Sequence, residues 1–374
     1  MVCQSITFKD FRNVEDEVCD FCDGVNLLWG KNAQGKSNML EGVYFFARGK
    51  SFRGAKEKEL IRFGGEAARL SLDFRRDGDK FPVKLEALIP TAGRKLLSRN
   101  GGKLSGVRDM IGDFRAVLFS PTHLTLVSGG PAVRRNFMDI ALSQLYPAYL
   151  ESLSAYKRLL LQRNALIKDV QMKKILPSEE IWEAYALQMS TLSAGIAQRR
   201  YEYMKELNCS VKELFSGMTG GREEPELIFH SEALPADPDN IMTEGKDSVY
   251  RALTENTERE IKYGATLFGI HKDDIAIKLN GKEAKLFASQ GQQRSLALSM
   301  KLAEGEMSRK LGGEYPVFLL DDVLSELDSE RREFVLSKLR GRQIIVTSCE
   351  PDLFSGGGAD KLIHIENGKI TGTE

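Results

Sequence analysis

An eight-residue stretch near the start of the chain combines two glycines, a lysine and a serine in a spacing that suits phosphate chemistry. It satisfies the pattern G-x-x-x-x-G-K-[ST] and consists of Gly30, Lys31, Asn32, Ala33, Gln34, Gly35, Lys36 and Ser37. In such a loop the backbone N–H groups converge on a β-phosphate, the lysine reaches the β- and γ-phosphates, and the hydroxyl binds Mg²⁺. The pattern predicts a nucleotide-phosphate cradle; the alternative is an ordinary glycine-rich turn.

A metal-bound phosphate needs a further oxygen ligand, and an apolar segment far along the chain ends in two carboxylates. Residues 317–320 predict a buried strand, and Asp321 would emerge at its end, where Mg²⁺ would sit. Asp322 is placed to orient an attacking water, with Asp328 or Glu326 as the next candidates for that base. The guanine-reading pattern N-K-x-D does not occur in the sequence, which favours ATP as the nucleotide.

A third segment predicts a second anion site at the start of a helix. In Ala288-Ser-Gln-Gly-Gln-Gln-Arg294, Ser289 is a natural N-cap and Gly291 allows close approach of a backbone. The segment resembles the signature motif of ABC-type ATPases, whose usual form is Leu-Ser-Gly-Gly-Gln. This resemblance implies that Ser289, Gly291 and Gln292 cover the ATP bound by a partner subunit, so that two chains enclose two nucleotides in an ATP-dependent homodimer.

Further segments resemble the RecF family, the bacterial recombination-mediator ATPases, along nearly the whole chain. They are FRN at Phe11, GKSFRG at Gly49, LFSP at Leu118, GGPAVRRNFMD at Gly129, TLFGIHKDD at Thr266, the signature with LLDDVLSELD, and HIENGKI at His364. The resemblance implies a weak, DNA-stimulated ATPase that grips gapped or duplex DNA, including single-strand/duplex junctions, and releases it on slow hydrolysis. It also implies cooperation with RecR in loading RecA where single-strand-binding protein sits.

The same resemblance assigns roles to residues outside these motifs. By comparison with the related Rad50 and SMC heads, Arg12 reaches a phosphate; the alternative is a surface salt bridge. The loop from Ser325 to Asp328 would touch the partner subunit. Arg134 and Arg135 serve either DNA or the domain junction, and the sequence leaves both interpretations open.

Several positions depart from the family pattern. Ala33 replaces a usual glycine, a mild change if its φ is negative, and Thr347-Ser348 stands where transporter subunits carry a switch histidine. Changes also occur beside two of the four histidines, at Thr122-His123 and on both sides of His271. Each histidine either lines the nucleotide site or is a hydrogen-bonded structural residue.

The elements that must position these residues alternate between strand and helix texture at both ends of the chain. Between them, apolar residues recur every three or four positions from Trp182 to Leu214, which predicts a long amphipathic helix that pairs with an earlier one over about 149–170. We therefore expect an α/β protein, an ABC-type P-loop ATPase head built from residues 1–130 and 262–374, with an inserted mainly α-helical domain at 131–261. The insertion is either a protruding arm or a compact bundle.

Composition narrows the classes of protein. The chain has 374 residues with 53 basic and 53 acidic side chains, so DNA binding would need basic residues gathered on one face. No apolar run is long enough for a membrane span, no secretory signal is visible, and five scattered cysteines suit a reducing cytoplasm. The C-x-x-C of Cys19 and Cys22 lacks a second pair for zinc.

Two other functions remain as alternatives. The chain could be the head of a coiled-coil chromosome protein of the SMC or Rad50 type, although an insertion of about 130 residues is short for a long rod. It could also be the nucleotide-binding subunit of a transporter, but the switch histidine expected after QIIVTS is absent.

Overall fold

The computed structural model describes residues 1–350 and 358–374. The chain forms two compact units, the first comprising Met1–Thr125, Glu213–Arg222 and Ser289–Glu374, and the second Leu126–Lys212 and Glu223–Ala288. The second unit therefore extends beyond the boundary expected at residue 261. The physical reason is strand pairing: β10 (Asp274–Leu279) pairs with β9 (Pro225–His230), which belongs to the same unit.

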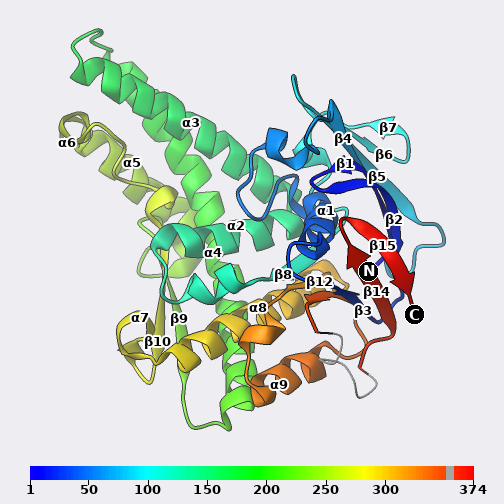
Figure 1. Cartoon of the computed structure of the whole chain (residues 1–374). Helices are drawn as coiled ribbons and strands as arrows, with labels where there is room; N and C mark the ends of the chain where they lie inside the picture. Colours follow the sequence, from blue (N-terminus) through cyan, green and yellow to red (C-terminus); the bar gives the residue numbers. More distant parts are fainter. Residues whose placement is uncertain (351–357) are drawn as a thin grey trace. The chain divides into compact units, whose positions relative to one another are not determined.

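A six-stranded sheet with mostly parallel pairing carries the chemistry-bearing segments of the first unit. Its order is β15-β14-β3-β13-β12-β8. The central strands are β3 (Val25–Trp29), β13 (Ile344–Ser348) and β12 (Val317–Asp321), followed at one edge by β8 (Ala116–Phe119) and at the other by β14 (Lys361–Glu366) and β15 (Lys369–Thr373). The late strand β14, red in Figure 1, pairs with the early strand β3, and β15 pairs with the other side of β14. This confirms an α/β fold in which the two ends of the chain build one sheet.

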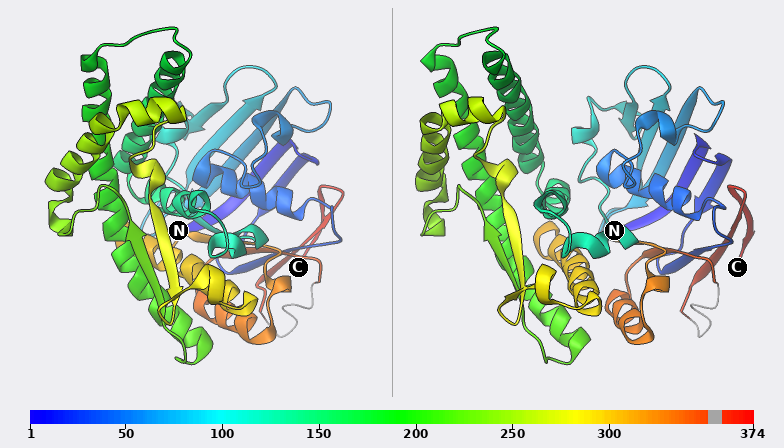
Figure 2. Two further views of the ribbon diagram at one scale, coloured as in Figure 1. Left: turned by 90° about the vertical axis from the view of Figure 1, so that its left-hand side faces the viewer. Right: turned by 60° about the vertical axis from the view of Figure 1, so that its left-hand side comes forward.

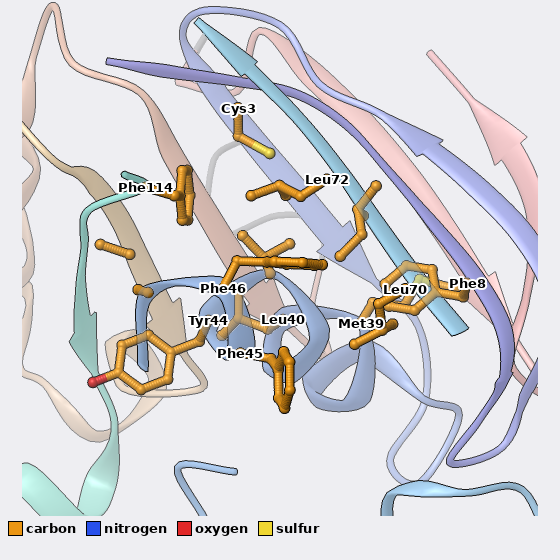
Figure 3. Close-up of a cluster of buried hydrophobic side chains, with 14 of the residues drawn as sticks. Cys3, Phe8, Met39, Leu40, Tyr44, Phe45, Phe46, Leu70, Leu72 and Phe114 are labelled. Carbon is orange, nitrogen blue, oxygen red and sulfur yellow. The ribbon is translucent and has the colours of Figure 1, made fainter. Parts of the chain in front are cut away.

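The second sheet of this unit is antiparallel, in the order β2-β1-β4-β5-β6-β7. Its strands are β1 (Val2–Phe11), β2 (Val14–Asp20), β4 (Ala67–Arg75), β5 (Val83–Pro90), β6 (Leu96–Arg99) and β7 (Gly102–Lys103). Helix α1 (Lys36–Arg48) packs against β1 and β4, and its buried side chains Met39, Leu40 and Phe46 meet Phe8, Leu70 and Leu72 (Figure 3). The helix that follows the glycine-rich loop is thus fixed by the main hydrophobic core.

Asparagine-glycine pairs form the tight turns of several hairpins. Asn100-Gly101 joins β6 to β7 and Asn280-Gly281 joins β10 to β11 (Lys282–Glu283), with positive φ at both residues of each pair. Positive φ at two successive residues is the signature of the two-residue hairpin turn that asparagine-glycine favours. A third such pair, Asn367-Gly368, joins β14 to β15.

Two helices complete the first unit near the carboxyl-terminal strands. Helix α8 (Gln290–Gly312) begins at the signature segment and packs against β8, and α9 (Ser329–Leu339) packs against α8. Short helical turns lie at Glu57–Leu60, Val107–Asp109, Pro121–Leu126 and Leu324–Glu326.

The second unit is mainly helical and also contains a small sheet. It includes α2 (Pro131–Leu145), α3 (Pro147–Gln171), most of α4 (Glu179–Thr219), α5 (Lys246–Glu255), α6 (Thr257–Tyr263) and α7 (Ala284–Phe287), with the three-stranded sheet β11-β10-β9. Short turns lie at Pro238–Asn240, Ile241–Gly245 and Ile270–Lys272. Both predicted long helices are confirmed, and α6 packs beside α3 (Figure 2). The insertion is therefore more than a bare helical hairpin.

No helix in the described part of the chain is both long and apolar enough to cross a bilayer.

Candidate phosphate-binding site

Strand register brings the predicted phosphate loop and the two aspartates to one edge of the parallel sheet. Leu28 of β3 lies level with Thr347 of β13, and Thr347 lies level with Asp321 of β12. The loop leaves β3 at Gly30, so it starts from the same edge at which Asp321 ends its strand. Ligands of open α/β sheets bind at this carboxyl edge.

The loop encloses a cavity of about 260 Å³. Its lining consists of Asn32, Ala33, Gln34, Gly35, Lys36, Ser37, Asn38, Arg53 and Asp322. Gly35 precedes the first turn of α1, so the positive end of the helix dipole faces this space. Most predicted loop residues therefore share one cavity, which has the polar lining that a phosphate needs.

Lys36 is folded back onto its own loop. Its ammonium donates to the carbonyls of Gly30 at 2.6 Å and Lys31 at 2.8 Å, and it lies 3.5 Å from Cys349 Sγ. Only 6% of the residue is exposed. A buried ammonium needs hydrogen-bond acceptors, and the loop carbonyls supply them here, as phosphate oxygens would in a nucleotide complex.

Ala33 has a left-handed backbone, with φ at +64°. The replacement of glycine at this position would be mild only with a negative φ, and that condition is not met. An L-residue in this region carries a steric cost of roughly 1–2 kcal/mol. The departure from the family pattern therefore strains the loop.

Two segments that sequence reasoning did not assign to the site hold Gln34 in place. Asn13 Nδ2 donates to the Gln34 carbonyl at 3.2 Å, and the Gly368 N–H donates to the same oxygen at 2.8 Å. The Asn367 N–H donates to Gln34 Oε1 at 2.6 Å. The motifs FRN and HIENGKI contain these residues, but only the fold brings both motifs onto the loop.

The two aspartates have different surroundings. Asp321 is buried and accepts a hydrogen bond from Thr347 Oγ1 at 3.1 Å, whereas Asp322 lines the cavity and has φ at +52°. The Asp322 N–H donates to the same Thr347 hydroxyl at 2.9 Å, and Ser325 Oγ donates to Asp322 Oδ1 at 3.2 Å. Thr347, at the predicted switch position, thus binds the carboxylate of Asp321 and the backbone of Asp322.

Arg12 does not line the cavity; Arg53 does. The Arg12 guanidinium forms two hydrogen bonds to the buried carboxylate of Glu41, at 2.9 and 3.1 Å, and donates to the Glu59 carbonyl at 2.9 Å. Glu41 also accepts a hydrogen bond from Ser51, whose hydroxyl accepts one from the Arg53 N–H at 3.0 Å. Arg12 therefore supports the loop that presents Arg53 to the cavity.

The signature residues lie outside the cavity of their own chain. Ser289, Gly291 and Gln292 are absent from its lining, although Ser289 caps α8 as predicted, with reciprocal hydrogen bonds to Gln292 at 3.3 and 2.6 Å. The neighbouring loop is tied to α8 through Arg294, whose guanidinium donates to the Glu326 carbonyl at 3.2 Å. Asp328 caps α9 and is bound by Arg331, so of the three candidate bases only Asp322 faces the cavity.

Both histidines have structural hydrogen bonds. His123 Nδ1 accepts from the Ser120 N–H at 3.1 Å, and His271 bridges the Tyr156 hydroxyl at 2.8 Å and the Thr266 carbonyl at 3.1 Å. Burial lowers the pKa of His123 well below its usual value and that of His271 to about 4, so both rings are neutral near pH 7. Neither lines the phosphate cavity.

The neighbouring residues Arg134 and Arg135 have different surroundings. Arg134 is buried and forms two hydrogen bonds to Asp274, at 2.7 and 2.8 Å. Arg135 is partly exposed, and its guanidinium donates to the Asp273 carbonyl at 2.8 Å. Arg134 is thus committed to its ion pair within the second unit.

The donor set suits a magnesium-bound polyphosphate. Lys36 and Arg53 supply two cations for phosphate oxygens, and the Ser37 hydroxyl with the carboxylates of Asp321 and Asp322 supplies oxygen ligands of the kind that Mg²⁺ prefers. The residues present therefore fit the group that the sequence pattern predicts.

Comparisons with known proteins agree with this geometry. Residues 2–371 match the family described as RecF/RecN/SMC N terminal domain. The chain is 37% identical over 372 residues to the DNA replication and repair protein RecF of Clostridium perfringens, with 99% of each chain covered. It is 37% identical over 373 residues to the protein of the same name from Acetivibrio thermocellus, again with 99% of each covered.

Solved structures show the same relationship. A structure described as the recombination mediator protein RecF-ATP in the RecFOR pathway superposes with a TM-score of 0.90 at 32% identity, over 99% of this chain and 96% of that one. An Smc head domain from Pyrococcus furiosus superposes with a TM-score of 0.58 at 16% identity, over 100% of this chain and 96% of that one. The second likeness concerns the fold alone.

Proposed function

The chain belongs to the RecF family, and we propose on that premise that it is an ATP-gated DNA-binding protein of recombinational repair and replication restart. The observation that carries the proposal is the cavity at the carboxyl edge of the parallel sheet, where the phosphate loop, Arg53 and Asp322 meet. A related chain at 32% identity has a solved structure described as RecF-ATP. ATP is therefore the ligand proposed for this cavity.

ATP binding would replace the hydrogen bonds that Lys36 donates to the carbonyls of its own loop. Lys36 would exchange the carbonyls of Gly30 and Lys31 for β- and γ-phosphate oxygens, which are charged and therefore stronger acceptors. Ser37 and Asp321 would hold Mg²⁺, which would offset part of the negative charge of the phosphates. Arg53 is the second cation of the cavity, and it replaces Arg12 as the candidate for phosphate contact from this side.

The signature segment would act on the nucleotide of a second chain. Its helix N-terminus and Ser289 hydroxyl suit an anion, yet neither lines the cavity of its own chain. In a symmetric dimer, the signature segment of each chain would cover the ATP bound in the cavity of the other chain. ATP is then part of the interface, and its binding is coupled to dimerisation.

Hydrolysis would end the dimeric state, with Asp322 as the residue that orients the attacking water. Its side chain lines the cavity, whereas Asp321 is buried and accepts a hydrogen bond from Thr347. Asp322→Asn keeps the size of the side chain and removes its basicity. We expect this variant to retain ATP binding and to form a dimer that persists; hydrolysis at the wild-type rate would exclude Asp322 as the base.

The biological role follows from the relatives, which are named DNA replication and repair proteins. We propose that the ATP-bound dimer grips gapped or duplex DNA in the cytoplasm and, with RecR, promotes RecA loading where single-strand-binding protein is bound. Hydrolysis would be slow and would release the DNA. The control of DNA affinity by nucleotide, rather than turnover itself, is the proposed activity.

Sedimentation with and without ATP and duplex DNA tests the proposal. The wild-type chain should be monomeric without nucleotide and dimeric with ATP. Lys36→Met should neither bind ATP nor dimerise, and Ser289→Arg should bind ATP and stay monomeric. A Lys36→Met chain that binds ATP as the wild type does would contradict the assigned cavity, whereas an ATP-dependent dimer of Ser289→Arg would contradict the shared nucleotide.

A further inference from the structure

Two large apolar side chains stand exposed on the short helix directly before the signature. Leu286 and Phe287 end α7, and each is 67% exposed. The same helix is anchored by Ala284, which is fully buried, and α7 packs on β10 and β11. The anchoring fixes the helix in place, so Leu286 and Phe287 are held outward from an ordered element. We call these two residues the pre-signature patch.

The pre-signature patch lies directly before the signature segment in the chain. Single exposed apolar residues are common on protein surfaces, whereas contiguous apolar patches occur at interaction sites. Only Ala288 separates Phe287 from Ser289, so their Cα atoms are at most about 7.6 Å apart. Any surface that closes over Ser289 must also come within reach of Phe287.

We infer that the pre-signature patch is a hydrophobic contact of the ATP-dependent dimer, and that its partner is the surface around the nucleotide cavity of a second copy of this chain. The inference rests on the proposed function, because it extends the interface that the signature would form. Ser289 has no nucleotide of its own chain to cover, so the surface that reaches it belongs to the other subunit.

The chemistry of the patch favours a protein surface over DNA. A phosphate backbone is recognised by charged and hydrogen-bonding groups, and neither Leu286 nor Phe287 supplies them. Lys282 lies with its ammonium 5.9 Å from the Phe287 ring centroid, an arrangement that leaves the rest of the ring open to a partner. The patch would lose its contact with water only when the second chain closes over it.

Truncation of both side chains should weaken the dimer and spare nucleotide binding. In a symmetric pair the patch occurs twice, so Leu286→Ala with Phe287→Ala removes four apolar side chains from the interface. Burial of such side chains makes about a tenfold loss per patch a modest estimate, or about a hundredfold in the dimer dissociation constant. ATP binding to the monomer should be unchanged.

The matched control removes one leucine and one phenylalanine of similar exposure elsewhere. Leu161 is 72% exposed on α3 and Phe81 is 79% exposed between β4 and β5, so Leu161→Ala with Phe81→Ala should dimerise as the wild type does. Leu286→Met with Phe287→Leu keeps the patch apolar and should restore most of the association. Circular dichroism of each double variant checks that the fold is retained.

The experiment is sedimentation equilibrium of each protein with ATP, beside titration of the monomer with ATP and of each protein with duplex DNA. Weaker dimerisation confined to the truncated pair, with normal ATP binding, supports the inference. Equal dimerisation of the truncated pair and the wild type overturns it while leaving the proposed function intact. A wild-type chain that stays monomeric with ATP overturns both, and a variant that dimerises normally but loses DNA binding assigns the patch to DNA instead.

Discussion

The positive φ of Ala33 strains the backbone of the phosphate loop, and substitution by glycine would remove this strain. Its φ of +64° is costly for alanine, whereas glycine adopts it freely. Ala33→Gly relieves a cost of roughly 1–2 kcal/mol, and the greater freedom of glycine in the unfolded chain offsets about 0.4–1 kcal/mol of it. We therefore expect the free energy of unfolding to rise by about 0.5–1 kcal/mol in urea titration.

The opposite substitution provides the control for this prediction. Ala33→Val places a β-branched side chain in the left-handed region, where it is less tolerated than alanine. The order of stability should be glycine, alanine, valine. A loop in which glycine is the least stable of the three would show that Ala33 does not have a positive φ in solution.

His271 should make the second unit sensitive to acid. Burial lowers its folded-state pKa from 6.5 to about 4, so between these values the unfolded state binds more protons than the folded state. The stability that this histidine contributes is complete above about pH 6.5 and falls by about 3 kcal/mol as the pH drops to about 4. Unfolding midpoints measured from pH 7 to pH 4 report this loss.

Asp273 changes the stability in the opposite direction over nearly the same pH range. The contribution of His271 is therefore measured by comparing the wild type with a variant that lacks this histidine. Burial raises the pKa of Asp273 to about 6, which makes its contribution to stability decrease as the pH rises from about 3.8 to 6. His271→Gln preserves a donor for Thr266 and an acceptor for Tyr156 while removing the titration. The pH dependence should differ between wild type and variant by the histidine contribution, and identical profiles would mean that His271 is not buried as a neutral ring.

The individual site residues differ in how far the sequence could identify them. The glycine-rich loop and the paired aspartates were found from spacing alone, because their chemistry is local. Arg12 and Arg53 could not be told apart in the same way. Each lies in a family-like motif, and only folding shows that Arg12 is bound to Glu41 while Arg53 faces the cavity.

The β14–β15 hairpin supports the phosphate loop through Gly368. The φ of Gly368 is +77°, and a Cβ added there would lie 2.2 Å from the Asn13 carbonyl oxygen. Gly368→Ala therefore adds a clash to the ordinary cost of a left-handed alanine, and the clash separates Asn13 and the hairpin turn that together hold Gln34. We expect a loss of about 2 kcal/mol or more in stability and weaker ATP binding.

Gly101→Ala is the matched control for the hairpin. Gly101 also follows an asparagine in a two-residue turn, with φ at +79°, and nothing lies within 4 Å of an added Cβ. This substitution should cost about 1–2 kcal/mol from backbone strain alone and leave ATP affinity unchanged. Equal effects of the two substitutions on ATP affinity would mean that the Gln34 contacts do not support the loop.

The sequence predicts helices, strands and turns where their signals lie in adjacent residues. It does not predict which distant strands pair with one another. The hairpin at Asp274–Glu283 turns at Asn280-Gly281, a pair that marks such a turn in a sequence because turn chemistry is encoded in adjacent residues. The sequence did not show that its strand pairs with β9, some fifty residues earlier, and so the hairpin was expected in the ATPase head. Long-range pairing depends on tertiary packing, which periodicity does not report.

DNA binding by the whole protein should depend on ATP, ignore base sequence and weaken steeply with salt. The proposed contacts fall on phosphates, and each neutralised phosphate of duplex DNA contributes a slope of about −0.9 to the log–log salt dependence. With 53 basic and 53 acidic residues, one chain offers at most a local basic surface. The dimer presents that surface twice, so its salt slope should be roughly double that of the monomer.

The test is the affinity of the protein for one DNA duplex at several salt concentrations. It is measured with ATP, with ADP and without nucleotide. Ser289→Arg with ATP serves as a control in which nucleotide is bound and the dimer is absent. Equal affinity in all nucleotide states, or a flat salt response, would leave an ATP-binding protein without gated DNA binding.

The strand order of the parallel sheet also has a consequence for synthesis on the ribosome. Strand β3, which ends at Trp29, has both of its neighbours, β13 and β14, between residues 344 and 366. At about 5–20 residues per second, more than 300 residues must be translated, over roughly 15–60 s, before either neighbour emerges. The nascent cradle remains without its sheet throughout that time, while the second unit is already complete in sequence by Ala288. A transcript that stops before the last strands would therefore yield a translated phosphate loop with no sheet to hold it.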